Sequence, residues 1–127
     1  MTDLMDTMRQ LMAANERRNI DAFLGFFADD VEYIYHVNAR PLVGIAWLEK
    51  FVRKYHETLE PLVWRIDRHA SNGNKLLVEG YEEYRVKASG ETVGHPYMGI
   101  VEFNDAGKIT HMRDYFEMDG KPLEQKA

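Results

Sequence analysis

The sequence predicts an α+β fold in which a cone-shaped, curved, mostly antiparallel sheet wraps around N-terminal helices. Up to about residue 60, apolar side chains recur mainly at helical spacing. Beyond that point, apolar and polar side chains alternate in consecutive segments separated by turn residues. Helices that precede a run of strands are typical of α+β proteins, with the helices on one face of the sheet. The concave face of such a sheet can hold a ligand.

Length and composition indicate one globular domain covering residues 1–127, because 45% hydrophobic and 12% aromatic residues suffice for a core. The net charge is −5 and the Lys and Arg residues are scattered, which argues against nucleic acid and anionic membranes as partners. The absence of cysteine excludes disulfides and a thiolate nucleophile. Without a signal-peptide pattern or a membrane-length apolar run, a cytoplasmic protein is expected.

Two helices are expected before the first strand. Thr2 can cap a helix with apolar side chains at helical spacing over residues 4–12, ending near residues 16–19. Asn19 can cap a short second helix whose apolar side chains extend over residues 20–27. So much apolar surface on a short helix indicates that it closes one side of the core.

A strand and a third helix follow. The strand covers residues 31–37, after Asp29 and Asp30 interrupt the helical pattern. Residues 45–55 again show helical spacing, and Pro61 is predicted to end that helix. Four strands are then expected, separated by turns: residues 62–70, 75–88, 92–103 and 108–118.

The last strand carries an acid where an apolar side chain is expected. Alternate side chains of a strand share a face, which places Asp114 in a row with Met112, Phe116 and Met118. A desolvated carboxylate is costly unless it is hydrogen-bonded, paired or protonated. Asp114 therefore requires either a partner or a function.

A second acid, Glu82, lies in the apolar row that includes Leu76, Val78 and Tyr84. Two carboxyl groups in one apolar cavity push their pKa values apart, which suits acid–base catalysis. The predicted catalytic residues are Asp114 and Glu82. The predicted substrate-binding residues are Tyr33, Tyr35, Tyr84, His95, Tyr97, Met112 and Phe116. Metal-binding, nucleotide-binding and serine-hydrolase motifs are absent, so neither a metal nor a cofactor is expected.

Each candidate also has a structural interpretation. Asp114 could pair with Arg68 or Arg40 and fix the core. A one-residue register error would exchange Glu82 with Glu83 and move it into water. The tyrosines could be packing residues whose hydroxyl groups have hydrogen-bond partners. His95 could simply form a hydrogen bond with a backbone carbonyl.

The early segment DAFLGFFADDVEY and the late segment GKITHMRDYFEM resemble the SnoaL-like and limonene epoxide hydrolase-like proteins of the ketosteroid isomerase superfamily, also called nuclear transport factor two-like. The resemblance spans roughly residues 15–118. It implies the same cone-shaped fold and a homodimer. The alternate face of the last strand, with Arg113, Tyr115 and Glu117, is the candidate dimer surface.

In the epoxide hydrolases that it resembles, two acids bridged by an arginine activate water together with an early tyrosine and asparagine. By motif, these acids fall on Asp114 and Glu82, and the tyrosine falls on Tyr33. Two positions depart from that pattern: Gly80 replaces the arginine, and Tyr35 replaces the asparagine. The SnoaL-like polyketide cyclases, which rely on a single acid–base aspartate, are the closer chemical analogue.

The sequence therefore predicts a pocket for a small, largely apolar, oxygenated molecule, with Asp114 as the acid–base residue of an isomerase, cyclase or epoxide-hydrolase type of reaction. A noncatalytic ligand-binding or dimerisation module with the same fold is the alternative. The cavity would separate the two: an open void lined by the acid favours an enzyme, and one plugged by Met112, Met118 and the first helix favours a structural role.

Overall fold

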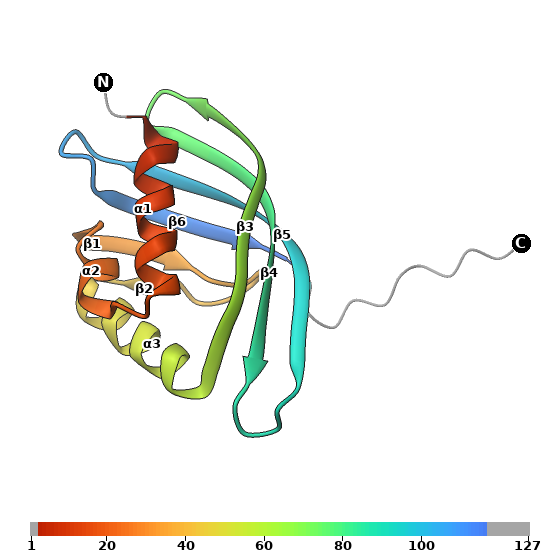
Figure 1. The fold of residues 1–127 in the computed structure, drawn as a ribbon. Coiled ribbons are helices and arrows are strands. Elements are labelled where there is room, and N and C mark those ends of the chain that lie inside the picture. Colours follow the sequence, from red (N-terminus) through yellow and green to blue (C-terminus); the bar gives the residue numbers. More distant parts are fainter. Residues whose placement is uncertain (1–2, 117–127) are drawn as a thin grey trace, which may run out of the picture.

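The computed structural model describes residues 3–116, which form three helices and one six-stranded curved sheet (Figure 1). In chain order the elements are α1 (Leu4–Glu16), α2 (Ile20–Leu24), β1 (Phe27–Ile34), β2 (Leu42–Val43), α3 (Ile45–Thr58), β3 (Leu59–Asn72), β4 (Lys75–Val86), β5 (Thr92–Phe103) and β6 (Ile109–Tyr115). The strand order is β2-β1-β6-β5-β4-β3, and every neighbouring pair is antiparallel except β1 and β6. The predicted α+β class and curved sheet are confirmed.

The helix starts follow the capping rules. Asp3 caps α1, since its carboxylate accepts a hydrogen bond from the amide of Met5 at 3.0 Å; the predicted cap, Thr2, lies outside the described residues. Asn19 caps α2 as predicted, accepting from the amide of Ala22 at 3.1 Å. Both helices present apolar side chains to the core.

The first strand begins earlier than the sequence pattern indicates. Phe27 already pairs with Ile109 of β6, and a break in the register lies between Phe27 and Glu32. The exposed pair Asp29 and Asp30 falls within this irregularity, so these acids do not prevent strand formation.

The boundary between α3 and β3 also differs from the prediction. The helix ends at Thr58, and the backbone is already extended at Leu59. Pro61 therefore lies inside β3 and does not terminate the helix. Because β3 is an edge strand, it tolerates a residue without an N–H group.

The core fills the space between the helices and the concave face of the sheet. The β4 row that includes Leu76 and Val78 faces inward as predicted and is largely buried, and so is the row of β5 that includes Val101 and Phe103. Hydrophobic side chains that pack around them partly cover the remaining inner surface. The inner face of the sheet thus presents a largely apolar surface to the helices.

Gly80 marks a point where β3 approaches β4 too closely for a side chain. A Cβ atom at Gly80 would lie 1.8 Å from the carbonyl oxygen of Arg65, next to the register shift between Ile66 and Arg68. The arginine that the epoxide hydrolases carry at this position is therefore sterically excluded. This departure from the family pattern therefore follows from how closely β3 packs against β4 in this sheet.

We expect Gly80→Ala to lower the free energy of unfolding by about 3 kcal/mol, because the clash is with the backbone of β3. Urea unfolding would measure the loss. Gly94→Ala is the matched control, since the nearest atom to its Cβ is the mobile hydroxyl of Tyr81. Equal stability of the two variants would contradict this interpretation.

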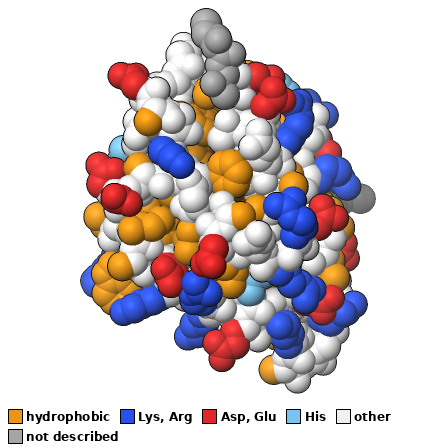
Figure 2. Space-filling model, turned by 60° about the vertical axis from the view of Figure 1, so that its left-hand side comes forward, with side chains coloured by type: hydrophobic (Ala, Val, Ile, Leu, Met, Phe, Trp, Pro, Cys, Tyr) orange, Lys and Arg blue, Asp and Glu red, His pale blue; other side chains and the backbone are white. Residues whose placement is uncertain are grey.

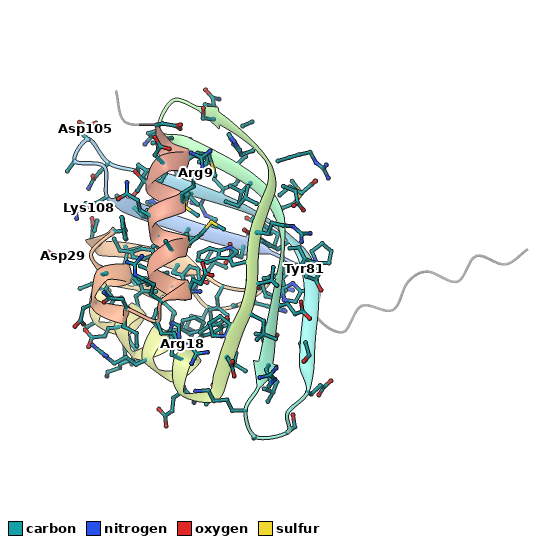
Figure 3. All side chains as sticks on the ribbon, viewed as in Figure 1. Arg9, Arg18, Asp29, Tyr81, Asp105 and Lys108 are labelled. Carbon is teal, nitrogen blue, oxygen red and sulfur yellow. The ribbon has the colours of Figure 1, made fainter. Side chains whose placement is uncertain are left out.

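The outer face of the sheet exposes an apolar patch. Met98 lies opposite Tyr115, and these side chains are 52% and 47% exposed; Leu77 is 39% exposed. Tyr81 lies on the same side, away from the helices (Figure 3). We propose this face as the surface of the homodimer that the family resemblance implies. The residue Glu117 lies outside the described residues.

Light scattering would test the dimer. We expect the wild type to have twice the mass of the chain, and Met98→Arg to be monomeric, since it would bury unpaired charges across the two-fold axis. A monomeric wild type would contradict the proposal.

The opposite side of the molecule, over α2 and α3, mixes hydrophobic side chains with charges of both signs (Figure 2). The residues that the structure describes form no extended area of one charge in this view. Among the described residues, none of the helices has the length and hydropathy needed to cross a membrane.

Candidate active site

A cavity of about 370 Å³ lies between α3, the start of β3 and the concave face of the sheet. This volume is within the range of small-molecule sites. Its walls are largely aromatic: Tyr33, Tyr35, Phe51, Tyr55, Trp64 and Tyr97. Met112 is part of the wall and leaves the cavity open, while Met118 lies outside the described residues. The first helix contributes Asn15 to the lining without filling the space.

Asp114 extends from β6 into this cavity. The position opposite it is Gly99, where a Cβ atom would lie 3.0 Å from the carboxylate oxygen Oδ1, so glycine leaves room for the acid. The hydroxyl of Tyr33 donates a hydrogen bond to Oδ2 at 3.2 Å. Within residues 3–116, no lysine or arginine nitrogen lies within 4.0 Å of Asp114; Arg68 pairs with Glu79 instead.

The environment of Asp114 favours its protonated form. Burial, reinforced by the negative charge of Glu82, raises the pKa of Asp114 to about 7, while the hydrogen bond from Tyr33 opposes the rise. An acid with such a pKa exchanges its proton readily at neutral pH. Asp114 therefore has the properties required of a general acid or base.

Glu82 lines the same cavity from β4. The register of the hairpin places Glu82, and not Glu83, on the inner face with Tyr84. Burial raises the pKa of Glu82 to about 7. The two acids thus share one apolar space and compete for protons.

His95 occupies a different place from the predicted one. It is buried, with 5% exposure, but it lies behind Glu82 and does not line the cavity. Its Nε2 atom is 3.2 Å from Oε1 of Glu82, and its ring stacks on Phe116 at 4.3 Å. His95 is therefore not positioned to contact a ligand in the cavity directly.

The aromatic side chains that line the cavity differ in their hydrogen bonding and in their exposure. The indole N–H of Trp64 donates to the hydroxyl oxygen of Tyr97 at 2.7 Å, so Tyr97 can still donate its own hydrogen to another acceptor. Tyr35, which is 37% exposed, packs against Phe51, and both it and the exposed Lys54 of α3 line the cavity. The remaining predicted residues Tyr84 and Phe116 also line the cavity.

The lining residues that were not predicted as site residues include the aromatic side chains of Phe51, Tyr55 and Trp64. The signal for Phe51 and Tyr55 was present, since both belong to the apolar face of the third helix. Their contact with the cavity depends on how α3 packs over the sheet, which the pattern does not specify. Among residues 3–116, no cluster of three His, Asp or Glu side chains could hold a metal ion.

The open cone of β-strands over helices, with acids in an aromatic cavity, defines a protein of the nuclear transport factor two-like fold. The sequence model of the SnoaL-like domain matches residues 8–112, so the chain belongs to the SnoaL-like domain family. No protein of curated function matches the sequence.

Similar solved structures include three with different descriptions. An LEH-like epoxide hydrolase from Mycobacterium tuberculosis is 22% identical, with a TM-score of 0.78 and coverage of 90% of this chain and 82% of that one. A candidate polyketide cyclase from Xanthomonas campestris pv. campestris is 19% identical, with a TM-score of 0.80 and 90% coverage of both chains. These likenesses concern the fold.

The third structure is a hypothetical protein with a ketosteroid isomerase-like fold from Catenulispora acidiphila, in complex with trimethylamine. It is 18% identical, with a TM-score of 0.77 and coverage of 88% of this chain and 85% of that one. The fold is therefore shared by proteins with different descriptions, and the fold alone does not assign an activity to this chain.

Proposed function

We propose that the protein is a cofactor-independent enzyme that performs acid–base chemistry on a small, largely apolar, oxygenated molecule, with Asp114 as the acid–base residue. The observation that carries the proposal is the carboxyl group of Asp114, buried in an aromatic cavity, whose pKa is raised to about 7. A structural acid would instead be matched by a fixed cation.

The reaction class that fits is proton transfer next to a carbonyl group. Ionised Asp114 would take a proton from the carbon beside the carbonyl and return it at another position of the same molecule, which leaves the overall composition unchanged. The Tyr97 hydroxyl would donate its hydrogen to the oxygen where negative charge develops. Burial raises the pKa of Tyr97, so it keeps that proton at neutral pH.

Epoxide opening is a second reaction that the same residues could support. Protonated Asp114 would donate to the ring oxygen while Glu82 accepts a proton from an attacking water. The absence of an arginine between the acids separates this arrangement from the hydrolases that the sequence resembles. A passive ligand-binding module is the alternative to both reactions.

A thermal-shift screen of apolar ketones, epoxides and lactones, followed by mass spectrometry of the products, would test the proposal. We expect at least one compound to stabilise the wild type and to be converted, and Asp114→Asn to lose the conversion. Asp105→Asn removes an equal charge from the exposed β5–β6 turn and serves as the control (Figure 3). Equal binding without product in all three proteins would favour a passive module, and no hit would favour a structural one.

A further inference from the structure

His95 and Glu82 form a buried pair behind the cavity wall. They lie directly opposite each other in the β4–β5 ladder. The Nε2 atom of His95 is 3.2 Å from Oε1 of Glu82, and the side chains are 6% and 29% exposed. Only the glutamate reaches the cavity. A residue on the far side of an acid can control that acid without touching a ligand.

The contacts of the imidazole fix where its hydrogens lie. Nδ1 is 3.2 Å from the carbonyl oxygen of Pro96, which can only accept, so Nδ1 carries a hydrogen. Nε2 then either accepts a hydrogen bond from the neutral carboxyl group of Glu82 or, as part of an imidazolium, donates a hydrogen bond to its carboxylate. The two states differ by the transfer of one proton along the 3.2 Å contact.

Aromatic packing holds the imidazole ring in this orientation. It stacks on Phe116, with the ring centroids 4.3 Å apart and the planes at 10°. Tyr84 meets its edge at 6.1 Å. Stacking of this kind also favours a planar cation. Phe116 in turn lines the cavity, so the wall connects the pair to the site.

The groups around the His95–Glu82 pair are a carboxyl group, tyrosine hydroxyls and a second imidazole. The titratable groups that act on this pair or face it are Tyr84 on β4, Tyr97 on β5, Asp114 on β6, Tyr33 on β1, Tyr55 on α3 and, across Phe116, His36. Within residues 3–116, no lysine or arginine nitrogen approaches Glu82 or Asp114 to 4.0 Å.

We propose that His95 is a positioning residue that supplies, from β5, the cation that Gly80 cannot carry on β4. As an imidazolium it keeps Glu82 ionised and oriented, and the charge of Glu82 in turn retains the proton on Asp114. The inference rests on the proposed function only for its catalytic meaning. Because Glu82, His95 and protonated Asp114 together are neutral, the site suits an uncharged ligand.

Side-chain carboxyl NMR of the ligand-free protein tests the proposal without any substrate. We expect the titration midpoint of Glu82 to rise by at least one pH unit in His95→Gln, because glutamine keeps a hydrogen-bond donor but cannot carry a charge. His111→Gln is the matched control, since it removes an imidazole near Glu32 on the outer face. An unchanged Glu82 midpoint in His95→Gln would overturn the proposal.

The reciprocal variant keeps the test decisive if His95→Gln does not fold. In Glu82→Gln at pH 7, ¹⁵N spectra should show His95 as a neutral ring with its hydrogen on Nδ1, whereas the wild type should show hydrogens on both ring nitrogens. Identical ring spectra in the two proteins would overturn the proposal. Either outcome is independent of turnover, so a failure here is distinct from a failure of the proposed function.

Discussion

Asp114→Asn should lower kcat by roughly 10²–10⁴-fold on any compound that the protein converts, with KM changed little. Asparagine has the same shape as aspartate and can still accept the hydrogen bond from Tyr33, but it cannot take up or release a proton. Steady-state kinetics with the best compound from the screen would measure the loss. Asp105→Asn should retain the wild-type rate. A rate for Asp114→Asn within threefold of the wild type would contradict an acid–base role.

The pH profile separates the roles of the two acids. The charge of Glu82 raises the pKa of Asp114, so Glu82→Gln should lower that pKa and move the pH optimum to lower pH. We expect this variant to keep measurable activity, because Glu82 modulates the proton of Asp114. A complete loss of activity would instead make Glu82 an equal catalytic partner.

The sequence pattern was sufficient to predict much of the sheet and the inward position of both acids. Period-two alternation and the turn at Ser89-Gly90 determine the β4–β5 register, which places Glu82 and Tyr97 on the inner face. Such a register is strongly specified because a one-residue slip would expose the whole apolar row. The same register pairs Glu82 with His95, so the position of the turn in the sequence was sufficient to predict this contact.

Features that depend on long-range packing could not be predicted. The parallel pairing of β1 with β6 joins segments far apart in the sequence, and it extends β1 back to Phe27. The approach of β3 to Gly80 depends on a bulge that leaves no local pattern. Likewise, the placement of Tyr55 against the cavity is set by the packing of α3. Local secondary-structure propensity carries no information on which distant segments of the chain pack against each other.

The stability of the protein should fall as the pH rises from about 4 to 8, and Asp114→Asn should remove a large part of that fall. Burial raises the pKa of Asp114 to about 7 in the folded state, whereas in the unfolded chain it has its ordinary value near 3.8. Between these values the folded state binds more protons than the unfolded state, so raising the pH favours unfolding. The full cost above pH 7 is on the order of 4 kcal/mol.

Thermal unfolding of both proteins at pH 5 and pH 8 would measure this effect. At pH 5 native Asp114 is protonated but the unfolded side chain is already largely ionised, so the variant should unfold about 5 °C higher; at pH 8, where the full cost is present, it should unfold about 10–15 °C higher. Asp105→Asn should match the wild type at both pH values, because its carboxyl group is exposed in both states. A variant less stable than the wild type at pH 8 would mean that the ionised carboxylate stabilises the fold. The buried acid would then be a structural element, and the catalytic proposal would lose its physical basis.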